Sequence, residues 1–340
     1  MVLELKKVKT DRLNVAYRQA GRAGAPKLLL LHGNASSGVF YEPLMEKLAD
    51  DFDMLAPDMR CFGDSDALAI DATGGMKVFS EDLDAFIRAV GWDKFALLGW
   101  SLGGGVAMQY AIDHSEKLSA LILQAPLSPF GYGGTYAEDG KKLEPVGIGS
   151  GAGAANQPLI KAVLEGDREF AGAAIDGSYV VQGFQIDAAV RERFIDSILK
   201  CKVGDDMWQG DFVQIEKWPF VASGTKGVAN TMSPKYCDLT ALVDIPNKMP
   251  ILWIYGNADL VVGDACFGDL AILGKMNIIP GYPGEDVYPN QPMVSQTRYV
   301  LEKYKAKGGI YKEVMVEGSG HGVMLDNEDR FIAELKDFLK

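Results

Sequence analysis

The sequence predicts an α/β protein with a mostly parallel central sheet covered by helices on both faces. Over residues 28–124, short and wholly apolar runs alternate with stretches whose apolar residues recur at helical spacing. This alternation is typical of parallel strands joined by crossover helices. With 48% hydrophobic and 24% charged residues, the composition is that of a folded protein. The length of 340 residues suits two domains, or one large domain with an insertion.

The amino-terminal part supplies most of the expected elements. Partial alternation of apolar and polar residues around Thr10-Asp11 predicts an antiparallel edge pair, at 2–9 and 13–19. Core strands are predicted at 28–31, 52–56, 95–98 and 118–124, and helices around 44–48, at 76–90 with Gly91 as its cap, and at 104–112. Loops of small residues follow two of these strands, at the sheet edge where ligands of such proteins bind.

The alternation stops at Pro126. Residues 127–157 are rich in glycine, and 149–153 are expected to form a flexible hinge. Helical patterns follow at 158–164 and 188–201. We interpret residues 127–245 as an inserted, largely helical cap over the site, because this stretch is too apolar to be disordered. Its aromatic residues either line a pocket or hold the cap together, and packing is the more usual role: Trp208, Phe212, Trp218 and Phe220.

The core resumes after the cap, so residues 1–126 and 246–340 are predicted to form one domain. Strands are expected at 249–255 and 310–316, and an amphipathic helix closes the chain at 331–339. Gly256-Asn257-Ala258-Asp259 follows the first of these strands, and Gly318-Ser319-Gly320-His321 follows the second. An aspartate and a histidine are thus expected at the same sheet edge as the two loops of small residues.

The pentapeptide Gly99-Trp100-Ser101-Leu102-Gly103 lies between a predicted strand and a predicted helix. A sharp turn there would lift the Ser101 hydroxyl clear of the sheet, and the flanking glycines would leave room for neighbouring backbone. The alternative is a glycine-flanked turn without chemistry, because short motifs of this kind also occur by chance. The position at a strand end favours the nucleophile.

A base for that serine is found among the three histidines of the chain. His114 falls where the serine's helix ends, which indicates a surface or helix-end role. His32 directly follows a core strand and is expected to brace the 32–38 loop by hydrogen bonds. His321 remains, and a loop imidazole between two glycines suits proton transfer from a serine.

The histidine in turn needs a carboxylate to fix its tautomer. Asp259 is the strongest candidate because the chain order Ser, Asp, His then matches the order known for this geometry. Asp264 and Asp244 are rivals, although loop aspartates are more often turn or cap residues.

The net charge and the spacing of the cysteines argue against several kinds of binding partner. The net charge of −12 would repel nucleic acid and anionic lipid. No apolar span approaches the ~20 residues of a membrane helix, and the start shows no signal-peptide core, so we expect a cytoplasmic protein that does not bind membranes. The four cysteines do not have the sequence spacing of a zinc site. They are expected to be buried or unreactive thiols: Cys61, Cys201, Cys237 and Cys266.

Taken together, these pieces resemble the α/β-hydrolase superfamily. The resemblance rests on Leu31-His32-Gly33-Asn34, the 58–65 loop, the Ser101 turn, Gly256-Asn257-Ala258-Asp259 and Gly318-Ser319-Gly320-His321, and it covers nearly the whole chain outside the cap. It implies that Ser101 is the nucleophile, His321 the base and Asp259 its orienting carboxylate. It also implies an oxyanion hole formed by the N–H groups of Asn34 and Leu102.

Two departures from the superfamily's pattern bear on function. The interval from Asp259 to His321 is longer than the usual connection, so an ordered excursion near the site is expected at 262–292. The cap matches no subfamily, so no substrate is implied. A serine nucleophile excludes relatives that need a carboxylate, namely dehalogenases and epoxide hydrolases.

The expected activity is therefore hydrolysis of a carboxylic ester or lactone of a small, fairly apolar substrate through an acyl-enzyme, with no cofactor and no metal. Hydrolysis of a carbon-carbon bond by the same triad and a slow-turnover ligand-binding receptor are the alternatives. The sequence is compatible with a homodimer but does not predict the oligomeric state.

Overall fold

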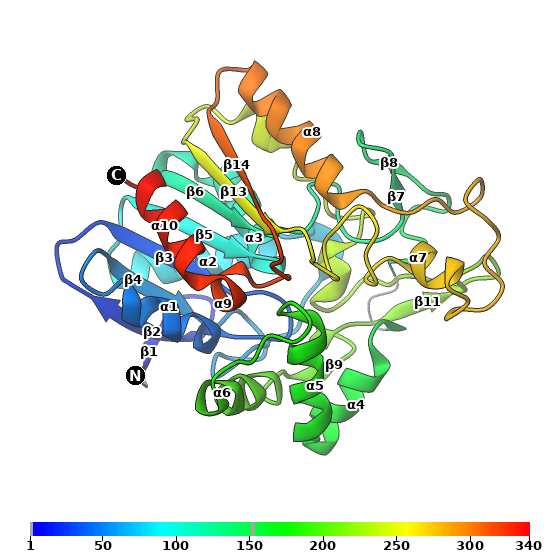
Figure 1. The fold of residues 1–340 in the computed structure, drawn as a ribbon, viewed down its shortest axis with the longest axis horizontal. Coiled ribbons are helices and arrows are strands. Elements are labelled where there is room, and N and C mark those ends of the chain that lie inside the picture. Colours follow the sequence, from blue (N-terminus) through cyan, green and yellow to red (C-terminus); the bar gives the residue numbers. More distant parts are fainter. Residues whose placement is uncertain (1–2, 151–153) are drawn as a thin grey trace.

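An eight-stranded sheet forms the centre of the protein, with the strand order β1-β2-β4-β3-β5-β6-β13-β14 (Figure 1). The structure, a computed structural model, describes residues 3–150 and 154–340. β1 pairs antiparallel with β2 and β2 with β4, and the other neighbours are parallel. The strands are β1 Leu5–Lys9, β2 Asn14–Gly21, β3 Lys27–Leu31, β4 Asp53–Pro57, β5 Phe95–Trp100, β6 Leu118–Gln124, β13 Ile251–Gly256 and β14 Tyr311–Val316.

These strands confirm the predicted α/β class and its antiparallel edge. β5 and β13 are buried along their whole length, as expected for parallel strands covered on both faces. Their positions agree with the predicted runs to within a few residues. Each apolar run ends at a glycine or a polar residue, which brings the chain out to the carboxyl edge of the sheet.

Helices cover both faces of the sheet. In Figure 1, α1, α9 and α10 lie in front of the sheet, whereas α2 and α3 lie behind it. α3 contacts β5, β6 and β3, and α10 contacts β13. These helices are α1 Glu42–Lys47, α2 Lys77–Val90, α3 Leu102–Asp113, α8 Met293–Ala306, α9 Val323–Asp326 and α10 Glu328–Phe338.

The predicted helix over 76–90 ends as expected at Gly91. That residue has φ +71°, and its N–H donates to the carbonyls of Ile87 and Arg88. A residue in the left-handed region that satisfies the last carbonyls is a common helix end, and glycine takes this conformation at the lowest cost.

Between β6 and β13 the chain leaves the sheet. Helices occur there as α4 Gln157–Glu165, α5 Arg168–Ser178 and α6 Ala188–Ile198. In the described part of residues 127–245, the remainder consists of turns, three two-stranded sheets and short 3-10 helices at Ala229–Met232 and Thr240–Asp244, so the α-helices lie in the middle of the segment. The short strands are β7 Thr135–Tyr136, β8 Lys141–Lys142, β9 Val203–Gly204, β10 Trp208–Gln209, β11 Phe212–Gln214 and β12 Val221–Ser223.

The sequence analysis missed α5, although Asp167 caps it by accepting from the N–H of Phe170. α6 ends at Ile198, a few residues before the predicted end. Of the glycine-rich stretch 149–153 that was predicted as a hinge, residues 151–153 lie outside the described residues.

The 262–292 stretch contains one helix, α7 Leu270–Lys275, and otherwise irregular chain. It packs on Trp218, whose indole N–H donates to Pro280 O at 3.1 Å and whose ring lies 4.7 Å from that of Tyr288. The stretch thus has its own small apolar cluster with residues of the 127–245 segment. Among the described residues, no helix is long and apolar enough to cross a membrane.

Candidate active site

Ser101 occupies a strained turn between β5 and α3. Its backbone dihedral angles are φ +57° and ψ −119°, a region that residues with a Cβ rarely adopt. The turn is held from both sides, because the Ser101 N–H donates to Gln124 O at 3.1 Å. Its carbonyl accepts from the N–H groups of Gly104, at 2.9 Å, and Leu127, at 3.2 Å. The side chain therefore projects from the sheet edge in a fixed direction.

Glycine is required on both sides of this turn. A Cβ on Gly99 would lie 2.2 Å from Gly103 O, and a Cβ on Gly103 would lie 2.4 Å from His32 O. Neither contact can be relieved by a side-chain rotation, because backbone atoms cause it. The predicted reason for the two glycines, room for neighbouring backbone, is confirmed. Gly33 brings the 32–38 loop against the turn, since its Cβ position is 3.1 Å from Ser101 Cβ.

Asp259 and His321 form a buried pair. His321 Nδ1 lies 2.8 Å from Asp259 Oδ2, and their side chains are only 2% and 1% exposed. The other carboxylate oxygen of Asp259 accepts from the N–H groups of Val261, at 2.7 Å, and Val262, at 2.9 Å. Because a carboxylate accepts, the proton of a neutral His321 is assigned to Nδ1, which leaves Nε2 free to take a proton.

The two rival aspartates lie elsewhere. Asp264 accepts from the N–H and hydroxyl of Ser295, at the start of α8, and Asp244 pairs with Lys307. Both contacts are typical of helix-end and surface carboxylates. Of the three candidates, only Asp259 is in contact with His321.

The His321 loop is joined to the serine turn through Trp100. The indole N–H of Trp100 donates to His321 O at 2.9 Å, and the two rings lie 5.4 Å apart. Among the described residues, no hydrogen bond joins the Ser101 hydroxyl to His321. Such bonds are often long until substrate binds. Ser101 itself is 9% exposed.

The other two histidines have the structural roles expected of them. His32 is fully buried: its Nδ1–H donates to Gly33 O at 2.8 Å, and its Nε2 accepts from the N–H of Met59 at 2.9 Å. Burial lowers the pKa of His32 to about 4, so it is neutral at neutral pH. His114 lies at the end of α3, 3.9 Å from Asp84.

The two backbone groups expected to form the oxyanion hole lie on either side of the serine turn. Leu102 is the first residue of α3, so its N–H has no intrahelical acceptor. Asn34 lies in the loop that Gly33 presses against Ser101. Two side chains from the 127–245 segment reach Asn34: Tyr179 donates to its carbonyl at 2.8 Å, and Trp208 Nε1 donates to its side-chain oxygen at 2.8 Å.

Tyr179 was not predicted from the sequence, and for Trp208 packing was favoured over lining a pocket. No local pattern points to either residue, because their partners are 145 and 174 positions away in the chain. The other three aromatic residues of that prediction lie away from Asn34. Phe212 and Phe220 are exposed, and Trp218 packs on Tyr288.

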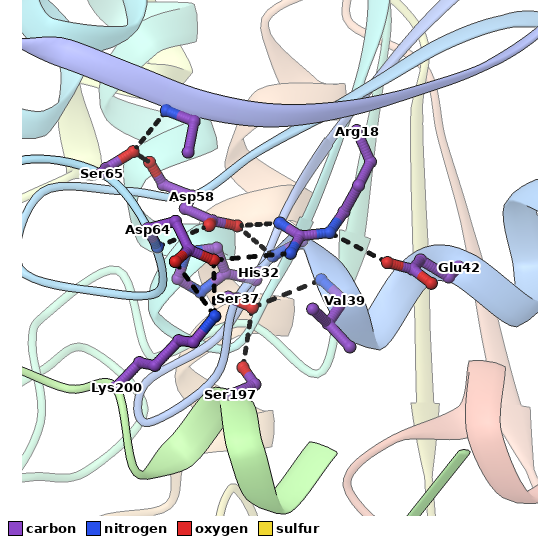
Figure 2. A network of polar contacts seen from close by, with 12 residues as sticks. Arg18, His32, Ser37, Val39, Glu42, Asp58, Asp64, Ser65, Ser197 and Lys200 are labelled. Atoms are coloured by element: carbon purple, nitrogen blue, oxygen red, sulfur yellow. Dashed lines mark hydrogen bonds and ion pairs between the residues drawn. The ribbon is translucent and has the colours of Figure 1, made fainter. Parts of the chain in front are cut away.

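A buried ionic network contacts the 32–38 loop (Figure 2). Arg18, which is 5% exposed, donates to Asp58 at 2.7 Å and to Glu42 at 2.9 Å. Asp58 also accepts from the N–H groups of Gly38 and Asp64, both at 2.9 Å. The Asp58 carboxylate is thereby fully paired, and it joins the 32–38 loop to Arg18 on β2. The sequence analysis marked the 58–65 loop but not Arg18.

The four cysteines are free and buried, as predicted. Burial raises the pKa of Cys61 to about 11 and those of Cys237 and Cys266 to about 12, and it also raises the pKa of Cys201. A thiol in this state is a poor nucleophile at neutral pH. Within the described ranges, no group of three or more His, Cys, Asp or Glu side chains is arranged to hold a metal ion.

Part of the sequence matches a known family. Residues 26–140 match the family model described as the alpha/beta hydrolase fold. An uncharacterised protein of Mycobacterium tuberculosis is 33% identical over 109 residues, which are 32% of this chain and 31% of that protein. Epoxide hydrolase 3 of Xenopus tropicalis is 27% identical over 117 residues, 34% of this chain and 32% of the relative.

A pimeloyl-[acyl-carrier protein] methyl ester esterase of Aeromonas hydrophila is 35% identical over 113 residues, 33% of this chain and 42% of the relative. The first two of these matches span about a third of the relatives' length, and the third spans less than half.

Solved structures match over nearly the whole chain. The enol-lactonase from Burkholderia xenovorans superposes with a TM-score of 0.59 at 15% identity, over 98% of this chain and 99% of that one. The bromoperoxidase from Bacillus anthracis superposes with a TM-score of 0.63 at 16% identity, over 99% of both chains. Because the sequence identity is this low, these superpositions show that the folds are similar and nothing more.

Proposed function

We propose that this chain, which has the α/β-hydrolase fold, is a serine hydrolase of that superfamily that cleaves a carboxylic ester or lactone through an acyl-enzyme. The observation that carries the proposal is the buried hydrogen bond between His321 Nδ1 and Asp259 Oδ2, at 2.8 Å, beside the strained Ser101 turn. A carboxylate, an imidazole and a hydroxyl in this order are the parts of a nucleophilic triad.

The proposed reaction has two halves. The Ser101 oxygen attacks the substrate carbonyl carbon while His321 Nε2 takes the hydroxyl proton, and Asp259 stabilises the imidazolium that forms. The negative oxygen of the tetrahedral intermediate accepts from the N–H groups of Asn34 and Leu102. When the intermediate collapses, the carbon-oxygen bond to the leaving group breaks, and His321 gives the alcohol its proton.

Water completes the second half. His321 removes a proton from a water molecule, whose oxygen attacks the acyl carbon. A second tetrahedral intermediate forms on the same two N–H groups and collapses to release the acid, and the proton on His321 returns to the Ser101 oxygen. The bond that is made and broken on the enzyme is the Ser101 ester.

Ester chemistry is favoured over epoxide opening although epoxide hydrolases occur among the relatives. Attack on an epoxide by a serine hydroxyl would form an ether, which water does not cleave under these conditions. Attack by a carboxylate forms an ester that can be hydrolysed. The nucleophile position of this chain holds Ser101, so acyl substrates fit it.

A small, fairly apolar substrate is proposed because aromatic side chains surround the site. Trp100 lies 5.4 Å from the His321 ring, and Tyr179 lies 5.2 Å from Trp100. We place the substrate beneath the 127–245 segment, which contributes Tyr179 and Trp208 to the edge of the site.

A fluorophosphonate probe and a short-chain aryl ester test the proposal together. The wild-type protein should be labelled and should hydrolyse the ester, whereas Ser101→Ala should not be labelled and should lose about 10⁴-fold or more in kcat. Ser119→Ala is the matched control, because Ser119 is an exposed strand residue. It should behave as wild type.

Three outcomes would contradict the proposal. Equal ester turnover by the wild type and Ser101→Ala would exclude Ser101 as the nucleophile. Absence of both labelling and turnover, with tight binding of small ligands retained, would favour a receptor. Faster cleavage of a dienoic diketone than of any ester would shift the substrate class to carbon-carbon bonds.

A further inference from the structure

Asn34 is held by two donors that come from outside its own loop. The Tyr179 hydroxyl donates to the Asn34 carbonyl at 2.8 Å and lies 3.1 Å from the next carbonyl, that of Ala35. The Trp208 indole N–H donates to Asn34 Oδ1 at 2.8 Å. One contact restrains the backbone carbonyl of Asn34 and the other restrains its side chain, so the 127–245 segment holds Asn34 at two points.

Tyr179 is itself fixed in place. Its ring makes edge contacts with Trp100 at 5.2 Å and with Phe40 at 5.7 Å. Burial raises its pKa above the usual value, so the hydroxyl keeps its proton and stays a donor throughout the working pH range. Trp208 is fully buried. Neither side chain can leave Asn34 without opening a packed region.

The same segment also reaches the His321 loop. The Tyr179 carbonyl accepts from the N–H of Gly322 at 2.6 Å. The N–H of Val181 donates to Asp326 at 2.7 Å, and that carboxylate also accepts from the N–H of Gly320 at 2.7 Å. A Cβ on Gly320 would lie 2.6 Å from the Val181 nitrogen, so the glycines beside His321 allow this close approach.

Residues of α6 also contact the 32–42 region. Its Ser197 hydroxyl lies 2.7 Å from the Ser37 hydroxyl, and just beyond its end Lys200 pairs with Asp64 (Figure 2). The rings of Phe40 and Phe194 stack at 4.0 Å. The loop that carries Asn34 is therefore held along its length by residues far away in the sequence.

We propose that Tyr179 and Trp208 are positioning residues that hold the Asn34 N–H in the direction needed to bind the oxyanion. The inference rests on the proposed function, because it assigns these residues a part in the same reaction. A donor aimed in advance at the developing charge costs no reorganisation during the reaction, and a donor free to turn away loses much of its effect. The two side chains do not touch the reacting atoms.

Tyr179→Phe is the most direct variant, because it removes one hydroxyl and keeps the ring packing. Removal of an oxyanion donor costs about 10²–10³ in kcat, and loosening one should cost part of that, about 10-fold or more. KM should stay within about twofold, since the donor acts on the transition state. A trifluoromethyl ketone, which forms a tetrahedral adduct, should bind more weakly by about the same factor as kcat/KM falls.

Tyr304→Phe is the matched control. Tyr304 is fully buried and Tyr179 partly buried, and the Tyr304 hydroxyl likewise donates to a backbone carbonyl, that of Met249 at 2.6 Å, at the end of β13 remote from Ser101. Both variants should lose comparable thermal stability, but only Tyr179→Phe should lose kcat. Trp208→Phe, combined with Tyr179→Phe, should cost less than the product of the two single losses, because both act on Asn34.

Several results would overturn the inference. Equal kcat losses in Tyr179→Phe and Tyr304→Phe would reduce the effect to stability, and a rise in KM alone would make Tyr179 a substrate contact. The wild type is measured first, with the fluorophosphonate probe. If it is neither labelled nor active, the proposed function fails and the inference falls with it. If it is labelled at Ser101 and Tyr179→Phe turns over normally, only the inference fails.

Discussion

At the scale of single residues, the Ser101 turn depends on backbone atoms that lie too close together for any side chain. α3 shows this well, because the Cβ position of its second residue, Gly103, is 2.4 Å from two carbonyl oxygens of the β3 end. α5 contains a glycine of the opposite kind: Gly177 has nothing within 4 Å of its Cβ position. The two helical glycines form a natural pair for comparison.

Gly103→Ala should therefore lower the free energy of unfolding by about 3 kcal/mol or more, because backbone must shift to admit the methyl group. Gly177→Ala should raise it by about 0.5–1 kcal/mol, since alanine is the better helix former and the site is open. Urea unfolding of both variants measures the difference. Equal effects would contradict the close approach of α3 to the β3 end.

His32 makes stability depend on pH. Burial lowers the pKa of this imidazole to about 4, below the ~6.5 of an unfolded chain. Between those values the unfolded chain binds a proton that the folded chain does not, so the stabilising effect is complete above about pH 6.5 and is lost as the pH falls toward 4. The full effect is about 3 kcal/mol.

Urea unfolding at pH 7 and at pH 4.5 should show this loss in the wild type. His32→Gln should be less stable at pH 7, because the Met59 N–H and Gly33 O would lose well-placed partners, and it should show a shallower decline between the two pH values. An unchanged decline would mean that other groups cause it.

At the scale of secondary-structure elements, a buried polar cluster joins α8 to two irregular segments. The Gln296 side chain on α8 accepts from the Ser128 hydroxyl at 2.6 Å and from Gln291 at 2.8 Å, and it donates to Ala137 O at 3.0 Å. Gln291 in turn donates to Gly131 O at 2.9 Å. Both glutamines are almost fully buried. The cluster holds parts of the 127–245 and 262–292 stretches against the core.

Gln296→Ala should cost about 2–4 kcal/mol, because it leaves several buried polar groups without partners. Hydrogen exchange should speed up first at residues 130–137, whereas β5 and β6 should keep their protection relative to global unfolding. Gln109→Ala on α3 is the control: within residues 3–150 and 154–340 this side chain donates to Asp113 alone, and its removal should cost about 0.5 kcal/mol or less. Uniform faster exchange would contradict a local role.

The elements also show which structure was predictable. The core strands of the sheet could be located because they are short apolar runs followed by glycine or a polar residue, as β5 and β13 are. α5 was missed because its glycines and mixed pattern weaken the helical signal. Gln291 and Gln296 could not be recognised, since their partners lie more than 150 positions away in several cases.

At the scale of the whole molecule, the order of strands brings the candidate triad together. Ser101, Asp259 and His321 follow β5, β13 and β14, which lie with β6 in one parallel part of the sheet. The carboxyl ends of parallel strands share one edge, so three distant loops could be placed together from the sequence alone. The long interval before His321 is accommodated because 262–292 packs outside the sheet, followed by α8.

What the sequence could not supply is the relation between the 127–245 segment and the site. Tyr179, Trp208 and α6 contact the 32–42 region through hydrogen bonds and ring packing that only the folded chain creates. Such contacts leave no periodic pattern, because each is made by a single side chain whose partner is far away in the sequence.

The acyl-enzyme is the central claim, and rapid trapping tests it most directly. The protein is mixed with a short-chain aryl ester, quenched in acid within the first turnover and digested, and the peptides are weighed by mass spectrometry. We predict one acyl group, on the peptide that carries Ser101, together with a burst of phenol equal to the enzyme concentration. Ester turnover with the acyl group on another residue, or with no acyl group and no burst, would contradict the account.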